Sequence, residues 1–463
     1  MDRRWIRSVT WVLLVSALTG CVSYEPRPLD APALIARVDQ ARLAPEETAG
    51  EGVTFAQAAS WLRRHGPSVR EAVAAYQTAL ARARIPTPWP NPGLEVGPEY
   101  AFGPDAATNS VAPFGGIGIT IPLGGRLART DDLNQVVARV AQVDGLARHR
   151  ELYLELRRHW VRLAAARATL LIRNDVVRAA AQSIATSRRL VDAGQATALD
   201  VALFELERGR READRLAGVA EEAEAVADLS ALVGVHTDRF LALNPAERPD
   251  SNAPLPDLAS LKGRLVAQHA GLARLRARYE ESEAALRLDV AKQFPDFHIG
   301  PAGSAEAGDD RTLLGLTLGI ELPLFDRNQQ AIAEAEARRE EVRVRYEAEA
   351  NRALAGLERA HRAAVIASER HRALRETVLA QAQDSIALAR RSVSAGVGDA
   401  MRLLDAERGF RQVRLDVEKA AMAEAVARVD VEIAVGTPLF RFPSEASGET
   451  PAPPDGLESE GER

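Results

Sequence analysis

Two long stretches without proline constrain this chain of 463 residues more than any other feature. After Pro122 the next proline is Pro245, and after Pro323 the next is Pro438, although prolines are frequent elsewhere. Both stretches are rich in alanine, leucine, arginine and glutamate, and proline is excluded from helix interiors because it lacks a donor and clashes with the preceding turn. They therefore predict two long helical hairpins, and their recurrence about two hundred residues apart predicts an internal repeat.

A pair of alternating segments precedes each proline-free stretch. Leucine or isoleucine occupies every second position in 314–322, and isoleucine does so in 117–121, with glycine, threonine or glutamate between them. Such alternation predicts strands with one apolar and one polar face. We expect strand pairs at 94–121 and 294–322, whose faces suit lipid on one side and a wet lumen on the other. The alternative is a pair of soluble hairpins.

The expected helices differ in length within each repeat. The long helices are expected at about 126–192 and 327–393, and at ~1.5 Å per residue each is about 100 Å long. The returning helices, at about 197–235 and 398–435, are too short to run the same distance alone. Helices before the strands supply the missing length, so each repeat is expected to form one continuous column and one spliced column.

The remaining segments complete the predicted domain order. Residues 1–20 are interpreted as a signal peptide, 21–53 as an extended tether with several prolines, 54–245 as the first repeat, 246–440 as the second, and 441–463 as a disordered tail rich in proline, glycine, serine and glutamate. Residues 31–66, 236–268 and the carboxyl-terminal tail are expected to surround the middle of the columns as a belt.

The amino terminus has the organisation of a secretory signal. Arginines precede a short apolar run from Val9 to Leu18, which is followed by Leu-Thr-Gly-Cys at 18–21. This tetrapeptide resembles a bacterial lipobox, which implies cleavage before Cys21 and acylation of that residue, for example by palmitate. The next residue is Val22 and not the aspartate that favours retention in the inner membrane, so the outer membrane is the expected location. Because Cys21 is the only cysteine, the mature chain is expected to contain no disulfide; the plainer alternative is an ordinary buried or removed cysteine.

Four strands cannot close a sheet by themselves. An open sheet leaves backbone groups unpaired at its edges, which is costly in hydrocarbon. We therefore expect a mainly α-helical fold with membrane β-strands, in which three copies form a twelve-stranded β-barrel continued by a long α-helical barrel. Strand arithmetic alone also permits other copy numbers.

Several motifs together resemble those of the TolC-like outer membrane efflux protein family. They are the lipobox, Pro-Asn-Pro-Gly-Leu at 90–94, Phe-Pro-Asp-Phe at 294–297 and Leu-Pro-Leu-Phe-Asp-Arg-Asn at 322–328. Their order, spacing and duplication agree over about 54–440. The resemblance implies a homotrimeric outer-membrane exit duct of a tripartite efflux system, which passively conducts substrates delivered by a periplasmic adaptor and an inner-membrane RND-type pump.

The resemblance also implies a constriction where the long helices turn. Gly194 and Gly396 are expected to cap the long helices beside the adaptor-docking tips. Asp200 and Asp405 look like the constriction acids of the family, and Arg402 stands where another aspartate is usual. A ring of carboxylates in a pore concentrates cations, and an arginine nearby could pair with it and hold the mouth shut. The simpler interpretation is that Asp200 caps its helix and Asp405 lies on a wet helix surface.

Other classes of function find little support. The slightly negative net charge of −6 and the lack of a basic block argue against nucleic-acid binding. No glycine-rich phosphate loop appears, and His361 and His371 are ten residues apart, which is not a metal-ligand spacing. We therefore expect no enzyme, no cofactor and no metal site.

The functional class of the protein and the substrate that it transports each leave an alternative. The alternative class is a lipid-anchored periplasmic coiled-coil adaptor or scaffold, which would not need two alternating strand pairs. Within the efflux family, the Pro-Asn-Pro and Pro-Leu-Phe-Asp-Arg-Asn segments look more like the heavy-metal, CzcC-like branch than the haemolysin-exporting one. Only Met401 and Met422 remain in the mature chain, too few for a soft-ligand copper path.

Overall fold

The computed structural model divides into two units at Glu46. It describes residues 23–43, 53–101, 110–194, 196–241, 249, 253–305, 312–395, 400–445 and 452–457. In the first unit, residues 31–43 form the helix α2 (Ala31–Leu43), so the extended tether expected there was wrong for these residues. Pro32 lies in the first turn of α2, where its missing N–H has no intrahelical partner to lose.

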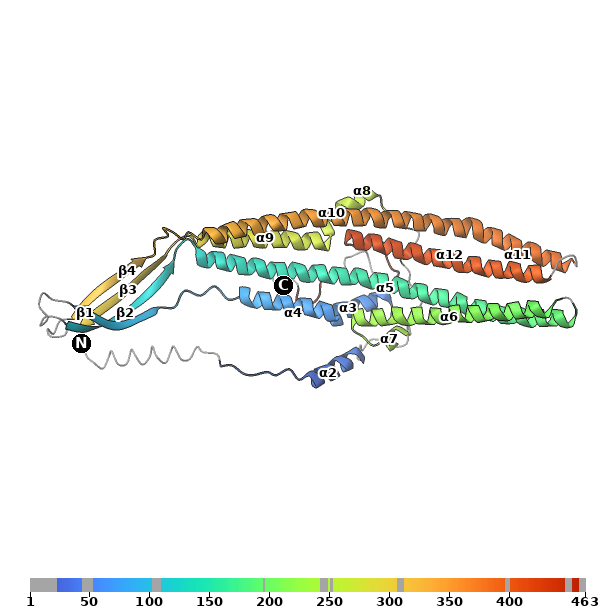
Figure 1. Ribbon diagram of the computed structural model, residues 1–463, viewed down its shortest axis with the longest axis horizontal. Helices are drawn as coiled ribbons and strands as arrows, with labels where there is room; N and C mark the ends of the chain where they lie inside the picture. The colour runs from blue at the N-terminus through green and yellow to red at the C-terminus, as the bar shows by residue number, and fades with distance from the viewer. Residues whose placement is uncertain are drawn as a thin grey trace. The chain divides into compact units, whose positions relative to one another are not determined.

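The second unit is mainly helical and contains one sheet (Figure 1). Its elements are α3 (Phe55–His65), α4 (Pro67–Ala83), β1 (Gly93–Ala101), β2 (Ser110–Pro122), α5 (Arg126–Asp192), α6 (Ala198–Val233), α7 (Asp238–Leu241), α8 (Leu258–Gln268), α9 (Ala270–Ala291), β3 (Asp296–Ala305), β4 (Thr312–Ile320), α10 (Gln329–Ala373), the π-helical turn η2 (Leu374–Val378), α11 (Leu379–Ser394) and α12 (Ala400–Val435). No helix among these described residues is long and apolar enough to cross a membrane.

The sheet is antiparallel in the order β1-β2-β3-β4. Its register places Ile119, Ile299 and Leu318 side by side, so most apolar residues of the four strands share one face. That face is open: its residues include Leu94 (71% exposed), Val96 (76%), Leu314 (87%), Leu316 (63%) and Leu318 (60%). The opposite face carries mainly glycines and polar groups, with Phe114 and Leu313 at one end, and there the hydroxyl of Thr120 lies 2.9 Å from Nδ1 of His298.

Two long helical paths extend from the strands (Figure 1). The helix α5 spans 67 residues, and both α4 and α6 pack along it. The helices α9 and α12 pack in the same way along α10, which continues through η2 into α11. The continuous and spliced columns expected from the helix lengths are therefore present in one chain. The π-helical turn η2 was not predicted, because its sequence is as helix-compatible as its flanks.

A core of large side chains lies where α3 meets the long helices. Phe55, Trp61 and Leu62 of α3 are buried against residues of α5 and α6, including Leu156, Trp160 and Leu229. The start of α3 is fixed by a capping box, in which Gln57 N–H donates to Thr54 Oγ1 and Thr54 N–H donates to Gln57 Oε1. A second cluster joins α8 to α10 and α12.

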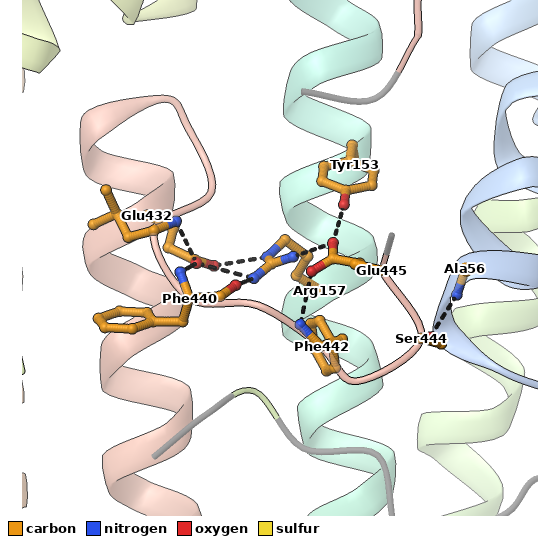
Figure 2. A network of polar contacts seen from close by, with 9 residues as sticks. Ala56, Tyr153, Arg157, Glu432, Phe440, Phe442, Ser444 and Glu445 are labelled. Carbon is orange, nitrogen blue, oxygen red and sulfur yellow. Dashed lines mark hydrogen bonds and ion pairs between the residues drawn. The ribbon is translucent and has the colours of Figure 1, made fainter. Parts of the chain in front are cut away.

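A buried ion network connects α5 to α12 (Figure 2). Arg157 donates from Nε to Glu432 Oε2 at 2.8 Å and from Nη2 to Glu432 Oε1 at 3.0 Å, and both side chains are 0% exposed. A third bond, at 2.7 Å, runs from Arg157 Nη1 to Glu445, which also accepts from Tyr153. The ring of Phe442 lies 4.8 Å from the Arg157 guanidinium carbon. Residues that follow α12 are thereby held on α5.

The carboxyl-terminal tail is more ordered than its composition predicted. Residues 441–463 were expected to be disordered, yet 441–445 and 452–457 pack on the helices, with Phe442 and Leu457 each 1% exposed. The composition gave the wrong expectation because proline and glycine occur in tight turns as well as in disordered segments. The mainly helical fold with one four-stranded sheet is confirmed, whereas the twelve-stranded trimeric barrel and the internal repeat remain predictions.

Candidate functional site: the hairpin tips

The first tip joins α5 to α6. Gly194 has a left-handed φ of 73°, and its N–H donates to Val191 O at 2.9 Å, which ends α5 as expected. Asp200 lies in a capping box with Thr197: its carboxylate accepts the Thr197 N–H at 2.8 Å and the Thr197 hydroxyl at 2.7 Å. These bonds lower the pKa of Asp200, so that it stays ionised at neutral pH. In the single chain, Asp200 acts as a helix cap.

The second tip joins α11 to α12. Residues 396–399 are outside the described residues, and Gly396 is one of them. Arg402 is exposed, and no ion pair is seen for it within the described ranges around this tip, 312–395 and 400–445. Asp405 is 67% exposed at its side chain and lies 3.5 Å from Arg408, one turn further along α12. Within the described part of the chain, no hydrogen bond or ion pair joins Arg402 or Asp405 to Asp200.

The two hairpins touch through residues that the sequence did not indicate. The guanidinium carbon of Arg408 lies 5.2 Å from the ring centre of Phe204 on α6, and Phe204 is only 6% exposed. Nearby, Arg211 Nη1 lies 3.4 Å from Gln412 Oε1, and Glu207 holds the other side of the same guanidinium at 2.7 Å. The triplet Glu-Arg-Gly at 207–209 and again at 407–409 is the signal that could have drawn attention to this contact.

Each hairpin is braced by one arginine–glutamate pair near its tip. Arg188 on α5 lies 2.6 Å from Glu205 on α6, and Arg390 on α11 lies 3.4 Å from Glu407 on α12. The partners are seventeen residues apart in both cases. These pairs are half-exposed, so they contribute little to stability, but they fix which faces of the paired helices meet.

Leucines lie exposed on the outer flanks of both hairpins near the tips. On α6 they are Leu199 (67% exposed), Leu203 (54%) and Leu206 (53%), which share one helix face, and on α11 the exposed leucine is Leu388 (63%). Along the helices α12 contacts both α11 and α5, and α5 contacts α6, while α6 and α12 meet near the tips. The exposed leucines thus lie on α6 in one hairpin and on α11 in the other.

The described residues of the tips carry charged side chains. No cluster of three or more histidine, cysteine, aspartate or glutamate side chains that could hold a metal ion occurs within the part of the chain that the structure describes. The predicted lipidation residue, Cys21, is outside that part. The tips therefore present carboxylate and guanidinium groups, which can exchange ion-pair partners.

Comparison with known proteins identifies the second half of the chain. Residues 254–437 match the family model for outer membrane efflux proteins. The predicted resemblance to TolC-like efflux proteins with a CzcC-like character is thereby confirmed. The family consists of outer-membrane channel proteins, which are not enzymes.

One curated relative and several solved structures resemble the chain. The cobalt-zinc-cadmium resistance protein CzcC of Cupriavidus metallidurans is 23% identical over 236 residues, 51% of this chain and 56% of the relative, so the match spans about half of that relative. The CusC structure has a TM-score of 0.67 at 18% identity, covering 90% of this chain and 100% of CusC. A membrane protein from Pseudomonas aeruginosa gives 0.65 at 19% identity, with 85% and 98% covered. These structural matches show a shared fold.

Proposed function

We propose that this chain is one subunit of a homotrimeric outer-membrane exit duct in a tripartite efflux system. In this proposal, Cys21 is acylated after signal cleavage, and the sheet lies in the bilayer. The helical hairpins project into the periplasm, where their tips meet an adaptor protein that is coupled to an inner-membrane RND-type pump. Substrates pass through the lumen passively, and the energy comes from the pump.

The open sheet is the observation that carries the proposal. Its apolar face is exposed along all four strands, while β1 and β4 form free edges at its two sides. An exposed apolar sheet with unpaired edges is unstable in water, and in lipid it must be closed. Large side chains gather at the ends of the strands that adjoin the helices: Trp89 (61% exposed), Phe294 (51%), Leu324 (65%) and Phe325 (93%). Aromatic residues in this position are typical of a membrane interface.

The flanking leucines support a ring of identical subunits. A contact that places α6 of one copy against α11 of the next would cover Leu203 and Leu206 on one side and Leu388 on the other. Because the two flanks differ, this contact is head-to-tail, which closes into a ring when the rotation allows it.

The likeness to CzcC favours divalent transition-metal cations as the cargo. That protein is named for cobalt, zinc and cadmium resistance, and Asp200 and Asp405, repeated by threefold symmetry, would raise the cation concentration at the mouth. Deletion of the gene followed by a panel of metals and drugs tests the cargo. Sensitivity confined to drugs would contradict it.

Cross-linking between strand edges tests the assembly. In a Cys21→Ser background, cysteines at Val96 of β1 and Leu316 of β4 should cross-link detergent-extracted protein into a ladder that ends at the trimer. Cysteines at Gly118 and Thr317, which lie on the polar face of the sheet, serve as a control that should not link copies. Protein that is soluble without detergent and stays monomeric would instead support the periplasmic adaptor or scaffold.

A further inference from the structure

The carboxyl-terminal segment 452–457 lies in a groove formed by three helices. Leu457 is 1% exposed, and its carbonyl accepts from Gln142 Nε2 of α5 at 2.9 Å. The carbonyl of Gly456 accepts from Gln77 Nε2 of α4 at 3.1 Å, and Asp455 lies 3.4 Å from Arg63 of α3. A segment far from these helices in sequence thus contacts each of them.

A tight turn shapes the segment for this groove. The N–H of Leu457 donates to Pro454 O at 3.1 Å, and Gly456 between them has a φ of 93°. A glycine with positive φ at the third position is the mark of a type II turn, and a side chain there would be strained. Added at Gly456, a Cβ would also lie 3.3 Å from Val73 of α4. The Pro-Asp-Gly-Leu sequence therefore suits this place.

The groove is shaped in turn for Leu457. Gly145 lies in the interior of the 67-residue helix α5, where glycine is unfavourable relative to alanine. A Cβ at Gly145 would lie 3.0 Å from both Cδ atoms of Leu457. The missing side chain at position 145 thus provides the space that the leucine fills.

We propose that residues 452–457 are a self-peptide that occupies a binding groove on α3, α4 and α5 and clamps α4 to α5. The helix α4 has 17 residues, of which Val69 and Tyr76 are buried, and the tail adds polar and apolar contacts to its packing on α5. The clamp acts next to the chain that leads into β1. It keeps α4 in place there. This role does not depend on the cargo or on the copy number.

The coupling between Gly145 and the tail provides the test. Gly145→Ala is compared in the full chain and in a chain that ends at Thr450, both in detergent, by thermal unfolding. In the shortened chain, alanine should raise the Tm, by about 1–2 °C, because it favours the helix. In the full chain, the same substitution should lower the Tm, because the methyl group displaces Leu457. Leu457→Ala in the full chain should restore the rise. An identical effect of Gly145→Ala in both chains would overturn the assigned groove.

Hydrogen exchange then tests the clamp itself. Ending the chain at Thr450 should speed amide exchange in α4 several-fold and leave α6 unchanged, since α6 makes no contact with residues 452–457 among those described. Adding a synthetic Pro-Ala-Pro-Pro-Asp-Gly-Leu peptide to the shortened chain should slow exchange in α4 again, and a peptide with Leu replaced by Asp should not. Unchanged exchange in α4 after truncation would overturn the clamp, even if the trimer and its conductance were intact.

Discussion

Arg157 of α5 and Glu432 of α12 form a two-bond ion pair in which both side chains are completely buried. Glu432 also accepts the backbone N–H groups of Leu439 and Phe440, at 2.7 and 2.8 Å, so its carboxylate is hydrogen-bonded by the backbone as well as by Arg157. Burial of two charges is costly unless they are paired and fully hydrogen-bonded, as they are here. The pair therefore acts mainly as a specific lock between the first hairpin and the second.

Replacing Glu432 with alanine should destabilise the protein strongly. The substitution removes the two-bond partner of the buried Arg157 and leaves it only Glu445 among its carboxylate partners, and breaking such a buried pair costs about 3–5 kcal/mol. The next pair along the same two helices, Arg158 with Asp430, is a matched control because its side chains are 34% and 38% exposed. Asp430→Ala should cost less than about 1 kcal/mol. Equilibrium unfolding of both variants in detergent measures the difference, and equal losses would contradict the special role of burial.

Stability should fall as the pH drops from about 6.5 towards 4. Burial, reinforced by Arg63 and Arg150, lowers the pKa of His149 to about 4, so the folded protein holds this histidine neutral. A group whose folded pKa lies below its unfolded value of 6.5 stabilises the fold above pH 6.5 and loses this contribution as the pH falls to 4. The full loss is about 3 kcal/mol.

The measurement is the free energy of unfolding between pH 7 and pH 5, a window in which most carboxylates stay ionised. His149→Gln should flatten the slope relative to the parent. Burial also lowers the pKa values of His159 and His269, so a smaller slope should persist in the variant. A slope unaffected by the substitution would assign the pH dependence to other groups.

A charge on the outer face of α6 should prevent assembly. Leu203→Glu places a carboxylate in the proposed contact between neighbouring copies, where it would lose its water. Native gel mobility and light scattering of detergent particles should then show monomers. Arg208→Glu, on the opposite side of the same helix, changes charge at an exposed position and should leave the trimer intact. Trimers of normal heat stability from the Leu203 variant would rule out this contact.

Weakening the tip contacts should make the channel leak. Alanine at Asp405 or Arg402, or at Arg408, which contacts Phe204 across the hairpins, removes charges that are expected to hold the closed mouth. Single-channel conductance in planar bilayers should rise several-fold, and cells should become sensitive to large antibiotics. Arg345→Ala, on the exposed surface of α10 and far from the tips along the chain, is the control. Unaltered conductance in all three tip variants would count against the gate.

Lipidation at Cys21 should be detectable directly. Cells supplied with labelled palmitate should incorporate the label into the parent chain and not into Cys21→Ser. The variant should also lose its lipid-dependent shift in mass. Label in the serine variant would show that another residue is acylated.

The sequence predicts the regular parts of this fold better than its connections. Helix α5 lies over the residues expected from Pro122 and Gly194, because proline and glycine act locally on the backbone. The faces of β4 follow directly from the alternation of its side chains. By contrast, the partnership of Arg157 with Glu432 spans 275 residues and leaves no local pattern.

The tips were predicted only in part for a related reason. The capping role of Asp200 follows from its distance to Thr197 within one turn. The contact between Arg408 and Phe204 depends on how two hairpins lie against each other, which no single helix determines. The ordered turn at Gly456 was missed because composition describes an average, whereas a glycine with positive φ serves one conformation.

The even number of strands in the sheet has a consequence for how copies of the chain can meet. Since β1 and β4 run in opposite directions, the last strand of one molecule can lie antiparallel to the first strand of the next around the whole circumference. The strands thus accept any number of molecules equally well. In the proposed ring, the choice between three and another number would then depend on the curvature of the helical wall, and so on the contact between the leucines of α6 and of α11.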